Sequence, residues 1–313
     1  MTRWRAQMLL RYLVWLAVPL LALVELGAYE VHAHRAPPPD EWKRLLPDAV
    51  TSLREDTDLI VAAPYWAEPN LRFALGDGLL PLRDVARPDE RRYPRAIEVG
   101  LGRERTSELL DWPVQQEKVV GPFHLRVLRN PSFTPVRFDF VDHLDPQHAE
   151  ASIRKKGEFR PCPWNERARV TNGALDNGHA TFPRTRFDCS GPEWNFVGVT
   201  VIEDERYRPR QCIWAPPSDA GVTRVRFDDV PLGKVIRGHA GLPYWVERWR
   251  KGDPIELSVS VGDEEVGKVQ HDDGEGWKGF EVTTERFAGQ RSSVLFQISG
   301  RGQRQFCFHA EAL

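Results

Sequence analysis

The sequence is poor in lysine and nearly balanced in charge. Of its 43 basic residues only eight are lysine, and the 45 acidic residues bring the net charge to −2. A nucleic-acid-binding surface needs a clear excess of basic residues, so this balance argues against nucleic acid as a partner. The arginine preference fits fixed ion pairs and planar polar ligands, and it also fits the base composition of a GC-rich genome.

The common catalytic signatures are absent as well. The chain contains no G-x-S-x-G, no G-x-x-x-x-G-K-[ST], no H-E-x-x-H and no C-x-x-C. Gly100-Leu101-Gly102 lacks the third glycine of a dinucleotide-binding fingerprint and indicates a turn. We therefore expect no catalytic residue, no cofactor and no metal.

Long apolar runs are missing except at the N-terminus. Met8 to Leu26 is interrupted only by Arg11 and Glu25, and it has the length of roughly 20 residues that crosses a bilayer as a helix. Arg3, Arg5 and Arg11 precede or begin the run. By the positive-inside rule the N-terminus is then cytoplasmic, and the rest lies outside the inner or plasma membrane, in a periplasm-like space.

A cleaved signal peptide is the alternative to an anchor. Val31-His32-Ala33 resembles a cleavage site, but the polar stretch from Glu25 to Ala33 is long for one, which favours an uncleaved anchor. Both interpretations export the remaining chain. Residues 1–33 are thus the predicted anchor, and residues 34–39 a proline-rich spacer.

All four cysteines lie in the exported part. An even number in an oxidising compartment favours disulfides, and no pair has the close spacing of zinc ligands. Three pairings are open, of which we prefer Cys162–Cys189 and Cys212–Cys307. The first closes a proline-rich segment that bears tryptophan, and the second joins the first and last strands of a C-terminal sheet domain.

Residues 40–131 alternate between helix and strand patterns, which predicts a small α/β domain with a partly parallel sheet. Apolar side chains from Trp42 to Leu53 follow helical spacing, with Asp40 as the expected N-cap. Residues 69–75 read as a helix closed by Gly76 and residues 106–110 as a helical turn. Expected strands cover residues 59–64, 96–100 and 123–128.

Residues 132–313 change to short strands separated by turns. This predicts an antiparallel β-sandwich, jelly-roll-like, and the whole chain is then α+β. The expected strands are 137–141, 196–202, 222–227, 234–239, 255–261, 265–270, 278–284, 294–299 and 305–309.

The segment Asp58-Leu59-Ile60-Val61-Ala62-Ala63-Pro64-Tyr65-Trp66-Ala67-Glu68-Pro69, followed by Gly76-Asp77, carries a resemblance. With the preceding helix, residues 40–77 resemble part of the soluble extracytoplasmic domain of multi-span glycosyltransferases that use lipid-phosphate sugars. Those enzymes hold their catalytic carboxylate between membrane helices, which this chain lacks. The resemblance therefore implies a detached soluble domain, not a transferase. The C-terminal half resembles a carbohydrate-binding jelly roll in pattern only.

The best candidate ligand site lies in the C-terminal half. Arg237 and His239 are two apart on an expected strand and so share one face, where they offer donors to sugar hydroxyls. Further ligand-binding candidates are His271 and Asp272, with Trp245 and Trp277 as stacking rings. The competing interpretation makes Arg237 an ion-pair partner, Trp245 part of the core and residues 271–277 a hairpin turn.

Two loops carry weaker hypotheses. Asp142, His143, Asp145 and His148 could ligate a metal, but a turn accounts for each of them. Asp272, Asp273 and Glu275 could hold calcium, which we do not favour because the spacing is not that of an EF-hand.

The sequence supports three hypotheses of function. The first is a membrane-anchored extracytoplasmic protein without catalytic activity, which recognises a glycan or assists an envelope glycosyltransferase. The second is a polysaccharide hydrolase that uses a carboxylate pair such as Asp272 and Glu275. The third is a structural or protein-interaction subunit.

Overall fold

The computed structural model describes residues 15–28, 37–171, 180–217, 221–249, 252–302 and 304–313. It divides into two compact units, the first formed by Met1–Leu80 with Arg95–Arg129 and the second by Pro81–Pro94 with Asn130–Leu313. The expected domains, 40–131 and 132–313, differ from these units in the segment Pro81–Pro94. That segment belongs to the second unit because its charged side chains find their buried partners there, as described below.

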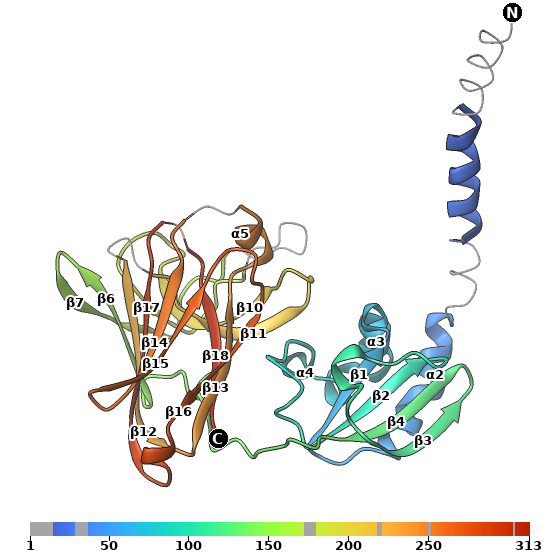
Figure 1. The fold of residues 1–313 in the computed structure, drawn as a ribbon, viewed down its shortest axis with the longest axis horizontal. Coiled ribbons are helices and arrows are strands. Elements are labelled where there is room, and N and C mark those ends of the chain that lie inside the picture. Colours follow the sequence, from blue (N-terminus) through green and yellow to red (C-terminus); the bar gives the residue numbers. More distant parts are fainter. Residues whose placement is uncertain (1–14, 29–36, 172–179, 218–220, 250–251, 303) are drawn as a thin grey trace, which may run out of the picture. The chain divides into compact units, whose positions relative to one another are not determined.

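Residues 15–28 form a helix (Figure 1). Their side chains are exposed. The first part of the predicted membrane segment, residues 8–14, lies outside the described residues. Among the residues that are described, no helix is both long and apolar enough to cross a membrane.

The first unit contains a four-stranded sheet in the order β1-β2-β4-β3. β1 (Asp58–Ala63) pairs in parallel with β2 (Arg95–Leu101), which pairs antiparallel with β4 (Phe123–Arg129), so the expected partly parallel α/β layer is present. β3 (Val114–Val120) is an edge strand that the sequence pattern misses, because its side chains are almost all exposed and do not alternate.

The helices of this unit are α2 (Pro39–Thr51) and α3 (Glu68–Leu79), with short 3₁₀ turns at Tyr65–Ala67 and Ser107–Leu109. The prediction of Asp40 as N-cap is wrong. The helix begins at Pro39, whose fixed φ and missing N–H suit the first helical position, and Pro38 stands at the cap without a side-chain bond. α3 is kinked at Gly76, where φ is 71° and ψ is 173°, so its first part ends at this glycine as expected, and a short second part follows to Leu79.

The second unit consists of two antiparallel sheets. The eight-stranded sheet has the order β16-β13-β18-β11-β10-β9-β8, with β5 paired to β18. In that order its strands are Lys278–Thr283, Val235–Gly241, Cys307–Ala312, Pro209–Trp214, Phe196–Glu203, Arg186–Asp188 and Trp164–Asn165, and β5 is Phe138–Asp139.

The six-stranded sheet has the order β15-β14-β17-β12-β6-β7. Its strands in that order are Glu264–His271, Ile255–Val261, Arg291–Ser299, Val222–Pro231, Ala149–Lys155 and Glu158–Cys162. The unit also has two short helices, α4 (Leu82–Val85) and α5 (Tyr244–Trp249), and a 3₁₀ turn at Glu285–Phe287.

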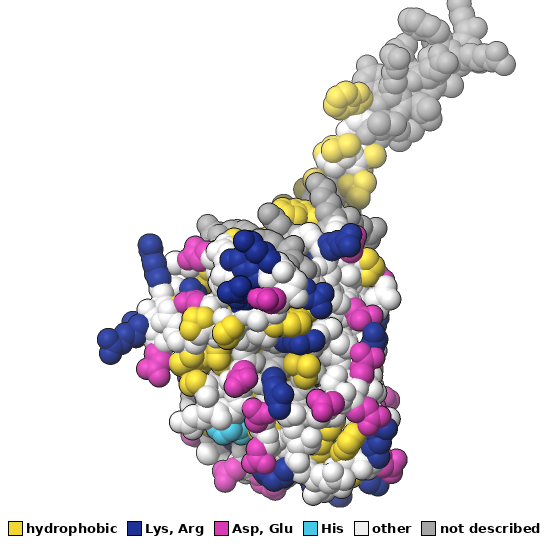
Figure 2. Space-filling model, turned by 90° about the vertical axis from the view of Figure 1, so that its left-hand side faces the viewer, with side chains coloured by type: hydrophobic (Ala, Val, Ile, Leu, Met, Phe, Trp, Pro, Cys, Tyr) yellow, Lys and Arg dark blue, Asp and Glu magenta, His cyan; other side chains and the backbone are white. Residues whose placement is uncertain are grey.

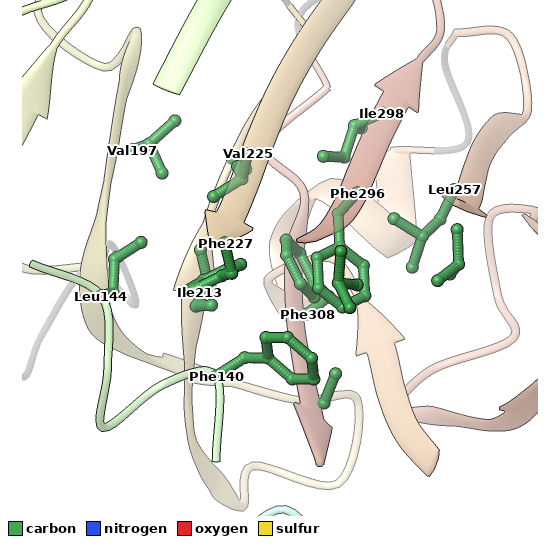
Figure 3. Close-up of a cluster of buried hydrophobic side chains, with 14 of the residues drawn as sticks. Phe140, Leu144, Val197, Ile213, Val225, Phe227, Leu257, Phe296, Ile298 and Phe308 are labelled. Carbon is green, nitrogen blue, oxygen red and sulfur yellow. The ribbon is translucent and has the colours of Figure 1, made fainter. Parts of the chain in front are cut away.

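Both sheets contribute side chains to one core (Figure 3). Phe296 of β17 has its ring 4.8 Å from that of Phe140 and 4.9 Å from that of Phe308, which lies in the opposite sheet. Alternation along each strand sends every second side chain into this layer. The prediction of a β-sandwich therefore holds at the level of two antiparallel sheets that share a core.

The two disulfides have the preferred pairing. Cys162 is bonded to Cys189 and Cys212 to Cys307. The second bond joins the neighbouring strands β11 and β18 and is fully buried, beside Trp214 and Phe196. No free cysteine occurs in the described chain.

Candidate functional site

Arg237 and His239 share one face of β13, as their spacing predicts, and this is the outer face of the eight-stranded sheet. Arg237 is paired with Glu311 of the adjacent strand, with 3.3 Å between its Nη2 and Oε2 of the carboxylate. His239 stacks parallel to Trp277, with 6.0 Å between the ring centroids. The structure therefore brings together three of the six predicted ligand-binding residues.

The segment Pro81–Pro94 covers this face. The indole N–H of Trp277 donates to the carbonyl of Pro88 at 3.0 Å, and Arg210 donates to the carbonyls of Arg87 and Pro88. Asp89 lies 3.7 Å from Nε2 of His239. Burial lowers the pKa of His239 to about 4, although Asp89 opposes the shift, so the imidazole is neutral at pH 7. A glycan cannot reach these donors while the segment is in place.

The other three predicted residues lie apart from that face. Trp245 belongs to α5 and packs edge-on to Trp249, with 4.6 Å between their centroids, and against the core. His271 is buried and bonds Glu247 through Nε2 at 2.7 Å. Asp272 is exposed in the turn after β15, where its N–H donates to Glu275.

The carboxylates of that turn have partners of their own. Glu275 accepts from Lys278 at 2.8 Å, and Asp273 accepts from Arg304 at 2.6 Å. Partial burial raises the pKa of Glu275. The hydrogen bonds from Lys278 and from the Asp272 N–H, together with the lysine charge, outweigh this effect and hold the pKa below its usual range. A general acid needs a raised pKa, so Glu275 has the wrong shift for the acid of a hydrolase pair.

A different part of the second unit is hollowed and lined for a polar ligand. One hollow of about 490 Å³ lies over β6, β7 and β12, and a second of about 580 Å³ adjoins it. Pro146 and Trp164 line both, so we call the pair the Trp164 groove. Each of the two hollows has a volume in the range of about 300–1,000 Å³ that is typical of small-molecule sites.

Aromatic rings form one side of the Trp164 groove. Trp164 is partly buried and stands edge-on to Phe187, with 4.9 Å between their centroids. Phe159 of β7 lies under the guanidinium of Arg224, which is 3.6 Å from the ring centroid. The disulfide Cys162–Cys189 joins β7 to the segment just after β9 and so fixes the two walls that carry these rings.

Charged side chains form the other side. Arg224 and Arg226 alternate with core residues along β12 and so point outward, and Glu150 is directly opposite Arg226 on β6. Arg224 donates to Gln297 at 2.8 Å, and burial together with Arg154 lowers its pKa. Asp145 and Glu166 line the second hollow. On the side of the molecule that carries β6 and β7, hydrophobic side chains lie among basic and acidic ones (Figure 2).

The sequence patterns did not predict this groove. The signal for the groove was present as the alternation of Arg224 and Arg226 with Val225 and Phe227, and as Trp164 two residues after Cys162. Only the pairing of β6 with β7 and β12 shows that these residues share a surface.

No protein-family model and no curated protein matches the chain. Several solved structures are weakly similar, among them the following three. The M60 catalytic domain with two CBM51 domains from Clostridium perfringens ZmpB is 9% identical, with a TM-score of 0.29, over 65% of this chain and 20% of its own. The CBM22 and GH10 modules of the Clostridium thermocellum xylanase 10B, complexed with xylohexaose, are 13% identical, with a TM-score of 0.23, over 37% and 24%.

The third is a family 43 arabinoxylan arabinofuranohydrolase from Bacillus subtilis in complex with cellotetraose. It is 10% identical, with a TM-score of 0.24, over 70% of this chain and 40% of its own. The chain thus spans between a fifth and two fifths of these proteins. At such TM-scores the likeness carries no argument about function, which must come from the site itself.

Proposed function

We propose that the second unit recognises a glycan in the Trp164 groove. The observation that carries this proposal is the meeting of exposed ring surface with forked donors and carboxylates in one open hollow. The C–H faces of a sugar ring pack on aromatic rings, and its hydroxyls pair with guanidinium and carboxylate groups. Trp164 supplies the first kind of contact, and Arg224, Arg226 and Glu150 the second, while Phe159 packs against the guanidinium of Arg224.

The hydrolase alternative has less support. The pair Asp272 and Glu275 lies in a hydrogen-bonded turn, and neither side chain belongs to the groove. Binding without turnover is therefore the expected behaviour.

The proposal includes an anchor in the inner or plasma membrane through residues 8–26, with both units on the extracytoplasmic side. The apolar run with its preceding arginines and the two disulfides support this location. Assistance to a membrane glycosyltransferase is the finer part of the proposal. Its support is the resemblance of residues 40–77, which form α2, β1 and α3, and the exposure of Trp66 and Phe73 on that segment.

The test is a glycan array followed by calorimetry on the full chain in nanodiscs, with Trp164→Ala as the groove variant. Trp249→Ala is the matched control, because Trp249 is 57% exposed and lies on α5, outside the groove. We expect Trp164→Ala to weaken binding about ten-fold, equivalent to ~1.4 kcal/mol for one lost aromatic contact, and Trp249→Ala to leave it unchanged.

Four results would contradict parts of the proposal. Equal losses in both variants would place the glycan elsewhere, and absence of binding in a folded chain would favour the interaction subunit. Extraction of the chain from membranes by carbonate, without detergent, would show that residues 8–26 do not anchor it in the bilayer. If cross-linking in membranes never captures a multi-span protein, the proposal that the chain assists a membrane glycosyltransferase is contradicted.

A further inference from the structure

Three ionisable side chains meet under the segment Pro81–Pro94, away from the Trp164 groove. His309 and Glu311 are two apart on β18 and so lie on the same face, and Asp139 of β5 is directly opposite Glu311. Each of the three residues is no more than 6% exposed. The sheet pairing, and not a flexible loop, holds them together.

His309 lacks a hydrogen bond at either ring nitrogen, and Oε1 of Glu311 lacks one too. Nε2 of His309 is 3.7 Å from Oδ1 of Asp139 and 3.7 Å from Oε1 of Glu311. These gaps are too long for hydrogen bonds. A buried imidazole without a partner is rare, and here it faces two carboxylate oxygens.

We propose that Asp139, His309 and Glu311 bind a divalent transition-metal ion, with Zn²⁺ as the best fit. One ligand atom from each residue can be chosen so that all lie within 4.8 Å of one another. Zinc ligands at about 2.0–2.2 Å, in tetrahedral arrangement, are separated from one another by roughly 3.3–3.6 Å. The observed 3.7 Å gaps need to close only slightly. One imidazole with two carboxylates suits zinc better than calcium, which prefers oxygen alone.

Two arginines hold the carboxylates from outside. Arg92 donates to Oδ2 of Asp139 at 2.8 Å, and Nη2 of Arg237 is 3.3 Å from Oε2 of Glu311. These contacts engage one oxygen of each carboxylate and fix its orientation, as residues around a metal site do. The other oxygen of Asp139, Oδ1, accepts from the N–H of Val141 at 2.9 Å and still faces His309. Arg92 also has Nε 3.3 Å from Oε1 of Glu311, and its positive charge opposes the metal. Loss of this charge should therefore tighten zinc binding.

The other histidine-containing loop differs. Nδ1 of His143 bonds the carbonyl of Asp139 at 2.7 Å, and Nδ1 of His148 bonds Asp145 at 2.8 Å. These imidazoles already have partners within the loop. His148 is therefore a suitable control residue.

The experiment uses the full chain, purified without a polyhistidine tag and stripped with EDTA. Zn²⁺ is the probe, with Ca²⁺ as a second arm. We expect one zinc per chain by elemental analysis and a rise in Tm of about 5–10 °C at a free Zn²⁺ concentration of 100 times Kd. Calcium should produce neither. His309→Gln should abolish both effects, and His148→Gln should leave them intact.

If His309→Gln does not fold, two further measurements test whether the site binds a metal ion. Co²⁺ in the wild-type chain should give the intense visible absorption of a four-coordinate ion, and Arg92→Met should bind Zn²⁺ at least ten-fold more tightly. Zinc that binds equally to His309→Gln, a chain that takes up no zinc, or the absence of the cobalt spectrum would each overturn the proposal. In those cases the three residues form a buried ion-pair network in which Arg92 neutralises Asp139 and Glu311.

Discussion

Replacement of Arg92 by methionine tests how far the second unit depends on the charges beneath Pro81–Pro94. The guanidinium of Arg92 is 2.8 Å from Asp139 and 3.3 Å from Glu311, and both carboxylates are almost fully buried. Methionine fills much of the same volume but leaves the two anions with less compensation. Removal of one partner from a buried pair costs about 3–5 kcal/mol.

For a unit of roughly 200 residues, this loss lowers Tm by about 6–20 °C. Differential scanning calorimetry in EDTA measures it, and the transition of the second unit should shift while that of the first does not. The matched control is Arg291→Met. Arg291 also bonds an aspartate, Asp229, but both side chains are exposed, so water screens the pair and Tm should hardly change.

A rescue variant separates lost charge from lost packing. Asp139→Asn with Glu311→Gln, in the Arg92→Met background, removes the uncompensated anions and should recover part of the stability. A shift for Arg92→Met as small as that for Arg291→Met would refute the reasoning, because the buried carboxylates would then not need the arginine.

Three further outcomes are expected. Replacement of Cys212 and Cys307 by alanine should destabilise the second unit by about 4–5 kcal/mol in urea unfolding, since the bond closes a separation of 95 residues, and removal of the bond that closes 27 should cost about 1 kcal/mol less. Burial raises the pKa of Asp58 to about 6 against the lowering effect of Arg54, so the folded state holds this proton more tightly than the unfolded state. The contribution of Asp58 to the stability of the first unit should then be largest below about pH 4 and fall by at most about 3 kcal/mol as the pH rises through 6, a dependence that Asp58→Asn removes in denaturant titrations. Trp277→Ala should lower Tm without weakening glycan binding, because the indole holds Pro88 and not the groove; a binding defect at unchanged Tm would contradict this.

Local patterns predicted the class of structure and many of the elements, but they missed strands such as β6, β7 and β11. Alternation along residues 222–227 and 255–261 predicts strands that the structure contains, and residues 59–64 predict the buried strand β1. β3 could not be predicted, because an exposed edge strand lacks the apolar alternation that marks a buried face. Asp40 was wrongly predicted as the N-cap of α2. Proline at the first helical position and aspartate at the cap both mark helix starts, and the sequence contains both, so the pattern did not distinguish them.

The candidate sites depended on information that a linear pattern does not contain. The spacing of Arg237 and His239 correctly put them on one face, and it could not reveal that Pro81–Pro94 covers that face. The Trp164 groove needs β6, β7 and β12 side by side, although β12 begins 60 residues after β7 ends. Likewise Asp139 reaches Glu311 only through the pairing of β5 with β18.

The sequence by itself therefore determined the apolar N-terminal segment, the change from mixed to all-β structure and the expectation of disulfides, whose pairing it left open with one preference. Each follows from short-range chemistry, such as the length of an apolar run, the period of a strand or the parity of cysteines. Tertiary structure alone decided which polar residues are buried together and which line an open groove. The physical reason is that strand order in a sheet is set by long-range pairing, and side chains distant in sequence become neighbours only after that pairing is made.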